Sequence, residues 1–205
     1  MNGLGVPLYP PSPSKTFTRP APYTSICHGV YEAATDSLYI GGYTSANRRT
    51  GGEHGGSAGT VVCRYDKVIA NNSLGSAVWQ TVLPYGPMAD IDGQGEVCSS
   101  FAAAGDYVFA VRGIIASVYV YHKSDGVLSK VLRLGAEVAG WSGWIDIQSG
   151  LNVHLRGNGE YVLMIEDDTV NKTNIIRWKP GATPLAAPSQ ISRPKSSTPS
   201  PEQKP

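Results

Sequence analysis

The sequence predicts an all-β protein built from short antiparallel strands. Between residues 23 and 179, apolar residues recur in short runs of Val, Ile, Tyr and Phe, and these runs are bounded by Gly, Asp, Asn and Ser. Runs of this length and composition are typical of strands separated by turns. No part of this segment has the apolar spacing of a helix over three turns. The fold prediction therefore rests on the strand pattern alone.

A tight turn leads into an aromatic or aliphatic strand three times, at LYIGGY, YVFAV and YVLMI. Each of these strands is preceded by another strand, in the order YTSICHGVYEA, EVCSSFAAA and LNVHLRG. Each is followed by a further one, in the order TVVCRYDK, SVYVYHKSDG and TNIIRWKP. The first two groups continue into a fourth strand, AVWQTVLPY and SKVLRLG. In the third group Pro180 follows at once, so we expect no full fourth strand there.

The third strands of the three groups share an aromatic residue near their ends. These residues are Tyr65, Tyr121 and Trp178, which are 56 and 57 residues apart. Near-equal spacing of equivalent residues indicates an internal repeat. The repeat predicts units of four, four and three strands.

Four antiparallel strands per unit of about 40–50 residues form the blade of a β-propeller. Residues 23–179 accordingly resemble roughly two and three-quarter propeller blades, at about 23–87, 88–135 and 150–179 plus loops. The resemblance is to the loosely repeating propellers of bacterial extracellular proteins and gluconolactonase-like proteins, without a named subfamily. A β-sandwich of about eleven strands fits the length equally well.

A propeller usually has 4–8 blades, so the predicted arc is incomplete. An open arc exposes sheet edges and apolar faces. Blades missing from the N-terminal side would complete the ring, and self-association of copies would do so as well. The sandwich alternative needs neither.

Proline marks the limits of the predicted domain. Six of the 15 prolines lie in residues 1–22 and seven in residues 180–205. Because proline removes a backbone donor and fixes φ, we expect a disordered N-terminal segment (1–22) and a disordered Pro/Ser-rich tail (180–205).

Composition and charge argue against several classes of partner. A net charge of +1 is too small for sequence-independent binding of nucleic acid. The chain shows neither a signal peptide nor an apolar run long enough to span a membrane, so no membrane partner is expected. These patterns leave the location of the protein open, and an extracellular location fits if N-terminal residues are missing.

Three cysteines, Cys27, Cys63 and Cys98, are expected to be small buried residues, with one disulfide plus a thiol as the alternative.

The longer loops are expected to lie on one face of the domain, and function usually resides on long loops held by a rigid scaffold. Trp141 and Trp144 flank Ser-Gly in one such loop and offer flat apolar surface for a sugar ring or a partner side chain. The ligand-binding residues predicted on this face are Trp141, Trp144, Asp146, Arg48, Glu53 and His54. The predicted partners are a carbohydrate or another protein.

Acidic residues on the same face suggest a cation as a second hypothesis. Ca²⁺ takes six to eight oxygen ligands, and the candidate ligands are Asp90, Asp92, Glu166, Asp167 and Asp168. The gluconolactonase-like resemblance implies a central divalent ion held by a Glu, an Asn and an Asp. These three ligands do not map onto individual residues of this chain, so no catalytic residue is assigned.

Three functions follow as alternatives. The favoured one is a non-catalytic binding segment without a cofactor, so the sequence favours a protein that is not an enzyme. The others are a metal-dependent hydrolase or lyase and a structural repeat fragment of a larger protein.

Overall fold

The computed structural model describes residues 17–21, 23–44, 61–82, 98–112, 116–141, 151–167, 172–186 and 191–192. Within these ranges the regular structure is strand, apart from one four-residue helix, α1 (Leu134–Glu137). The predicted all-β class is therefore confirmed. No helix in the described ranges is long and apolar enough to cross a membrane.

The strands form three antiparallel sheets that follow one another along the chain. The first sheet contains, in order, β1 (Tyr23–Glu32), β2 (Ser37–Thr44), β3 (Val61–Asp66) and β4 (Trp79–Val82). The second sheet contains β5 (Cys98–Ala104), β6 (Tyr107–Arg112), β7 (Ser117–His122) and β8 (Leu128–Arg133). The third sheet contains β9 (Asn152–Leu155), β10 (Tyr161–Asp167) and β11 (Lys172–Trp178). All the strands of the three predicted groups are present.

The fourth position of the third sheet holds two short strands that the sequence did not predict. β12 (Leu185–Ala186) pairs with Ile176 and Arg177, and β13 (Ile191–Ser192) pairs with Lys172 and Thr173. Pro180 lies in a turn directly after β11, where its missing donor breaks no ladder hydrogen bond. Gly181 follows with a φ of +83°, which glycine adopts readily. Proline therefore ends β11 without ending the sheet.

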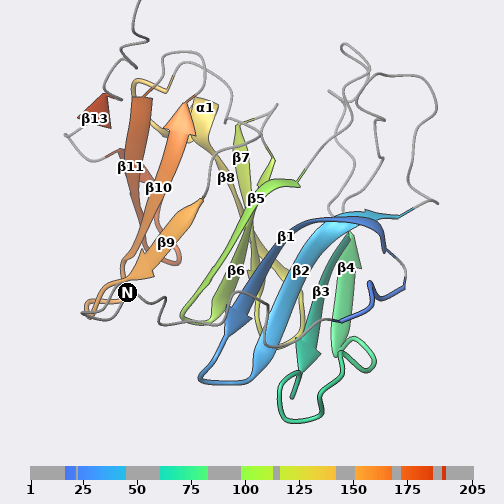
Figure 1. Cartoon of the computed structure of the whole chain (residues 1–205). Coiled ribbons are helices and arrows are strands. Elements are labelled where there is room, and N and C mark those ends of the chain that lie inside the picture. Colours follow the sequence, from blue (N-terminus) through green and yellow to red (C-terminus); the bar gives the residue numbers. More distant parts are fainter. Residues whose placement is uncertain are drawn as a thin grey trace, which may run out of the picture.

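The three sheets stack face to face, with the second sheet in the middle (Figure 1). Their first strands lie together, because β5 contacts both β1 and β9. Each sheet is open: its strands form a linear order that does not close on itself. The sheets therefore share one common side, formed by β1, β5 and β9.

The second sheet is buried on both faces, and this explains its nearly continuous apolar strands. One face packs on the first sheet through Val108, Ala110, Tyr119 and Tyr121. The opposite face packs on the third sheet through its own set of apolar residues, Phe109, Val111, Val118 and Val120. Both sets alternate along β6 and β7, as the period of a strand requires.

The three aromatic residues predicted to be equivalent occupy matching places. Tyr65, Tyr121 and Trp178 pair with the first or second residue of the preceding strand, and each is at most 2% exposed. Trp178 packs in the core between the second and third sheets, and Tyr121 packs in the core between the first and second. Each of these two thus faces the preceding sheet, whereas Tyr65 faces outward from the first sheet.

The chain itself covers the outward face of the first sheet. Tyr65, together with Ile40, Val61 and Cys63, packs against Val68 and Leu74 of the β3–β4 connection and against Phe17. Cys63 is a buried thiol whose Sγ lies 3.8 Å from Gln80 Oε1, as the sequence predicted for a small buried residue. This end of the stack is therefore closed by local side chains.

The β7–β8 turn should be sensitive to any side chain at Gly126. This glycine has a φ of +72°, and an added Cβ would lie 2.6 Å from Cε3 of Trp79, across the sheet interface. We expect Gly126→Ala to lower the free energy of unfolding by about 1–2 kcal/mol from the backbone and about 1–3 kcal/mol more from overpacking. Denaturant unfolding measures the loss.

Gly140→Ala is the matched control. Its φ is +77°, but an added Cβ would have no heavy atom within 4 Å. We expect only the backbone contribution of about 1–2 kcal/mol. Equal losses in the two variants would show that Trp79 does not pack against the turn as described.

Candidate functional site

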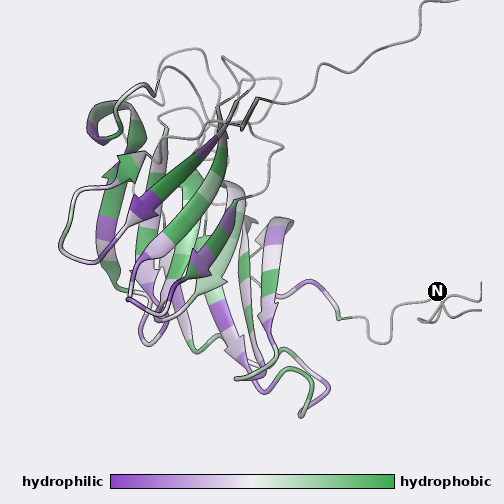
Figure 2. Cartoon of the chain, turned by 90° about the vertical axis from the view of Figure 1, so that its left-hand side faces the viewer, coloured by the Kyte–Doolittle hydropathy of each residue, from purple (hydrophilic) through white to green (hydrophobic). Residues whose placement is uncertain are grey.

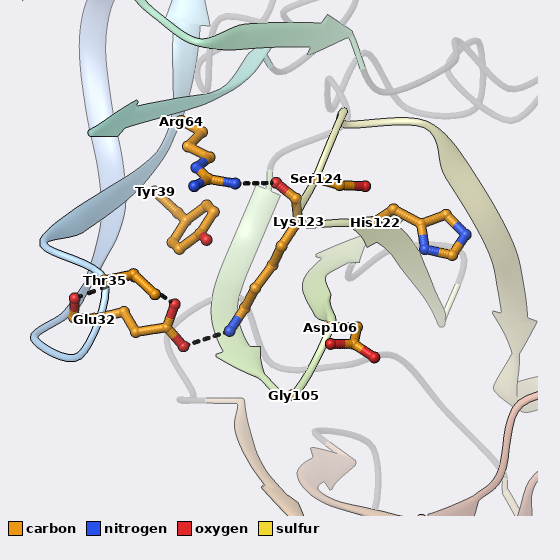
Figure 3. Close-up of a pocket in the computed structure, with 9 residues that line it drawn as sticks. All are labelled: Glu32, Thr35, Tyr39, Arg64, Gly105, Asp106, His122, Lys123 and Ser124. Carbon is orange, nitrogen blue, oxygen red and sulfur yellow. Dashed lines mark hydrogen bonds and ion pairs between the residues drawn. The ribbon is translucent and has the colours of Figure 1, made fainter.

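A polar cleft of about 470 Å³ lies between the first and second sheets (Figure 3). It is located at the end of the stack where the β1–β2, β5–β6 and β7–β8 turns meet. It is lined by Glu32, Thr35, Tyr39, Arg64, Gly105, Asp106, His122, Lys123 and Ser124. Figure 3 shows the side chains of the first sheet on one wall and those of Asp106, His122 and Ser124 on the other.

Lys123 spans the cleft. It follows β7, and its backbone N–H donates to Asp106 O at 2.8 Å, which fixes the start of its side chain. Its ammonium then donates to Glu32 Oε1 of the first sheet at 2.5 Å. Thr35 donates its hydroxyl to the other carboxylate oxygen of Glu32 at 2.9 Å. Although it is charged, Lys123 is only 8% exposed.

Arg64 makes the second polar connection between the sheets. Its Nε and Nη2 donate to the two carboxylate oxygens of Asp66 at 2.7 and 2.9 Å, a bidentate pair within β3. Its Nη1 donates across the interface to the backbone oxygen of Lys123 at 2.6 Å. Trp79 Nε1 donates to the same oxygen at 2.8 Å. One carbonyl of the second sheet is thus held by two donors of the first.

An aromatic ring lies among these charges. The Tyr39 ring centroid is 5.8 Å from Lys123 Nζ and 5.9 Å from Arg64 Cζ, within reach of cation–π attraction. Burial raises the pKa of the Tyr39 hydroxyl above its usual value. Tyr39 therefore remains a neutral hydrogen-bonding group at physiological pH.

Both carboxylates of the first sheet are ionised and paired. Burial raises the pKa of Glu32, but hydrogen bonds from Lys123 and Thr35 outweigh it and leave the pKa below its usual value. Burial likewise raises the pKa of Asp66, but hydrogen bonds from Arg64 and Ser37 outweigh it and leave the pKa of Asp66 below its usual value. A carboxyl group that acts as a general acid near neutral pH needs a raised pKa instead. Neither carboxylate is therefore suited to donate a proton.

The remaining wall offers groups for hydrogen bonding. The His122 ring lies against the Tyr107 ring with centroids 5.0 Å apart. Asp106 and Ser124 are exposed in the turns beside it. Within the described ranges, no group of three or more His, Cys, Asp or Glu side chains is placed to hold a metal ion. The cleft can therefore bind a polar molecule through donors and acceptors already held in place.

None of the residues predicted from the sequence is among the described residues that line this cleft. Trp141 is half-buried and packs on the core between the second and third sheets, beyond α1. Glu166 and Asp167 end β10, opposite Thr173 and Lys172 and far along the strand from its cleft-side turn. The other predicted residues lie outside the described residues: Trp144, Asp146, Arg48, Glu53, His54, Asp90, Asp92 and Asp168. The predicted loop site and the Ca²⁺ site therefore stay predictions.

The cleft residues were missed because no single segment contains them. Glu32 ends β1, Arg64 and Asp66 lie in β3, and Lys123 follows β7. The only local signal was Arg64 and Asp66 two residues apart, which places them on one face of a strand. Opposite charges at the ends of different strands are a weak further signal.

Comparisons with known proteins add no assignment: no family model matches the chain, and no curated protein sequence matches it.

The Lys123–Glu32 pair should couple the two sheets energetically. We expect a double-mutant cycle of Lys123→Met and Glu32→Gln to give a coupling of about 1–3 kcal/mol, because the side chains are only 10% and 28% exposed. The Lys130–Glu137 pair, at 3.9 Å and with the lysine 43% exposed, is the control and should give less than about 1 kcal/mol. Equal couplings would contradict an inter-sheet role for Lys123.

Acid should weaken the same connection. A carboxylate whose pKa is lowered by folding contributes stability above its unfolded pKa, about 4.3 for Glu and 3.9 for Asp, and this stability is lost as the pH falls through the folded value. Glu32 and Asp66 both have lowered values. We expect the free energy of unfolding of the wild type to fall from about pH 5 downward. The fall should be shallower in Glu32→Gln, and identical slopes would contradict the assignment.

Proposed function

We propose that the chain is a non-catalytic binding module, built as an open arc of β-propeller blades, that takes an uncharged hydroxyl-rich ligand such as a carbohydrate in the cleft. The observation that supports this proposal is that both cationic side chains of the cleft already form ion pairs within the protein. Lys123 is neutralised by Glu32, and Arg64 by Asp66. A ligand there meets fixed hydrogen-bonding groups, and the two cationic side chains that it meets are already neutralised.

The sheet arrangement supports the propeller part of the proposal. Propeller blades are four-stranded antiparallel sheets arranged around a central axis. Here the sheets stack with β1, β5 and β9 side by side, and Tyr65, Tyr121 and Trp178 face the same way along the stack. A β-sandwich has two packed sheets, whereas this chain stacks three.

The lining of the cleft supports a neutral polar ligand. The two cationic side chains of the lining, Lys123 and Arg64, are each already paired with a carboxylate of the first sheet, and Asp106 is an exposed carboxylate on the other wall. An anionic ligand would have to displace Glu32 or Asp66 from its ion pair, which costs more than hydrogen bonding to that pair. Sugar hydroxyls both donate and accept, so they match a lining that mixes carboxylate, guanidinium, hydroxyl and imidazole groups.

Ser124 provides the test. It is exposed on the cleft wall, so Ser124→Tyr fills the cleft without removing an inter-sheet contact. We expect the wild type to bind members of a panel of neutral glycans and Ser124→Tyr to bind them at least about tenfold more weakly by calorimetric titration.

Ser76→Tyr is the matched control, since Ser76 is exposed on the β3–β4 connection outside the cleft. It should bind as the wild type does. Equal loss in both variants, or no glycan binding by the wild type, would overturn the proposal.

A further inference from the structure

The outer face of the third sheet differs from every other sheet face of the stack. Its inner face packs in the core through Tyr161, Leu163, Ile165, Ile176 and Trp178. The outward residues of the same strands form two cross-strand rows: His154, Val162 and Arg177, then Asn152, Met164 and Ile175. Figure 2 turns this side toward the viewer, with apolar and polar residues mixed along the front strands.

The cationic part of this face is organised around one carboxylate. Glu160 Oε2 accepts from Arg156 Nη1 at 2.8 Å, and Glu160 Oε1 accepts from Arg177 Nε at 2.8 Å. The hydrogen bond from Arg177 is the main cause that lowers the pKa of Glu160. The two guanidinium side chains are 53% and 46% exposed, whereas that of Glu160 is 12% exposed.

This cluster keeps an excess of positive charge and of donors. Two guanidiniums share one carboxylate, and each guanidinium carries five N–H donors. Lys179 lies in the same region, with its Cε 3.8 Å from the position of a Cβ on Gly159. Among the described residues, three cationic side chains and one carboxylate therefore lie at the turn end of the sheet.

The apolar part lies directly beside the cluster. Val162 and Arg177 are cross-strand partners, and Met164 and Ile175 form the next pair along β10 and β11. Met164 is 40% exposed. The face thus offers guanidiniums at one end and aliphatic side chains next to them.

Another sheet of the same kind is a poor occupant for this face. The interfaces on both sides of the second sheet consist of aromatic and aliphatic residues. Stacking a similar sheet here would bury Arg156 and Arg177, which share a single carboxylate, and burying charge that is not fully paired is costly. The occupant must supply anions at one end and apolar groups at the other.

We propose that the outer face of the third sheet binds an extended acidic segment of a partner protein. Its carboxylates would pair with Arg156 and Arg177, and its apolar side chains would cover Val162, Met164 and Ile175. The planar guanidinium matches a carboxylate in a two-point hydrogen bond, as the bonds to Glu160 already show. A polyanion such as nucleic acid fits less well, because it would leave the aliphatic half uncovered. This inference is independent of the cleft.

The test uses the full chain and a fluorescein-labelled short peptide of alternating glutamate and valine, followed by anisotropy. We expect saturable binding that Arg177→Glu weakens at least about tenfold, since reversal replaces attraction by repulsion. Arg133→Glu is the matched control: Arg133 is exposed on β8 of the second sheet, and its reversal changes the net charge equally. It should leave binding within about twofold.

Met164→Ser tests the apolar half without a change of charge. We expect weaker peptide binding with unchanged unfolding, because Met164 contacts solvent in the free protein. This variant keeps the proposal testable if Arg177→Glu fails to fold. Unchanged binding in Met164→Ser, equal loss in Arg177→Glu and Arg133→Glu, or tighter binding of heparin than of the peptide would overturn the proposal.

Discussion

The burial of both faces of the second sheet is the constraint on which the rest of the structure depends. Val108, Ala110, Tyr119 and Tyr121 need the first sheet, and Phe109, Val111, Val118 and Val120 need the third. Fully burying a Val or Phe side chain among them stabilises a fold by about 1.5–3 kcal/mol. Neither outer sheet could be removed without exposing one complete apolar face, so the three sheets form one cooperative unit.

The cleft follows from where that apolar interface ends. At the turn end of the first and second sheets, polar side chains replace the apolar ones of the interface. Charges that approach one another there must be paired, because they are partly withdrawn from water. Lys123 meets Glu32, and Arg64 meets Asp66 and the Lys123 carbonyl. The same contacts that hold the sheets together thus create a lining of fixed donors and acceptors, which is the basis of the proposed binding function.

The outer faces of the first and third sheets, at the two ends of the stack, differ in what covers them. At the first sheet, Phe17, Val68 and Leu74 cover the face on which Tyr65 lies. At the third sheet, the outward face keeps Met164 exposed beside the Arg156–Glu160–Arg177 cluster. The apolar outer face of the first sheet is covered by other residues of the chain. The outer face of the third sheet, which mixes cationic and aliphatic side chains, is suited to a partner. The proposed acidic segment is a consequence of this asymmetry.

The sequence by itself determined the all-β class, the strands of the three groups and the equivalence of Tyr65, Tyr121 and Trp178, because strand and turn signals are local and the repeat makes them recur. The strand β12 beyond Pro180 was missed, since pairing with β11 depends on a turn at Gly181 and on an available sheet edge. The cleft was missed for a related reason. Glu32 and Lys123 are 91 positions apart, and only the packing of one sheet on another, which no local pattern encodes, decided that they meet.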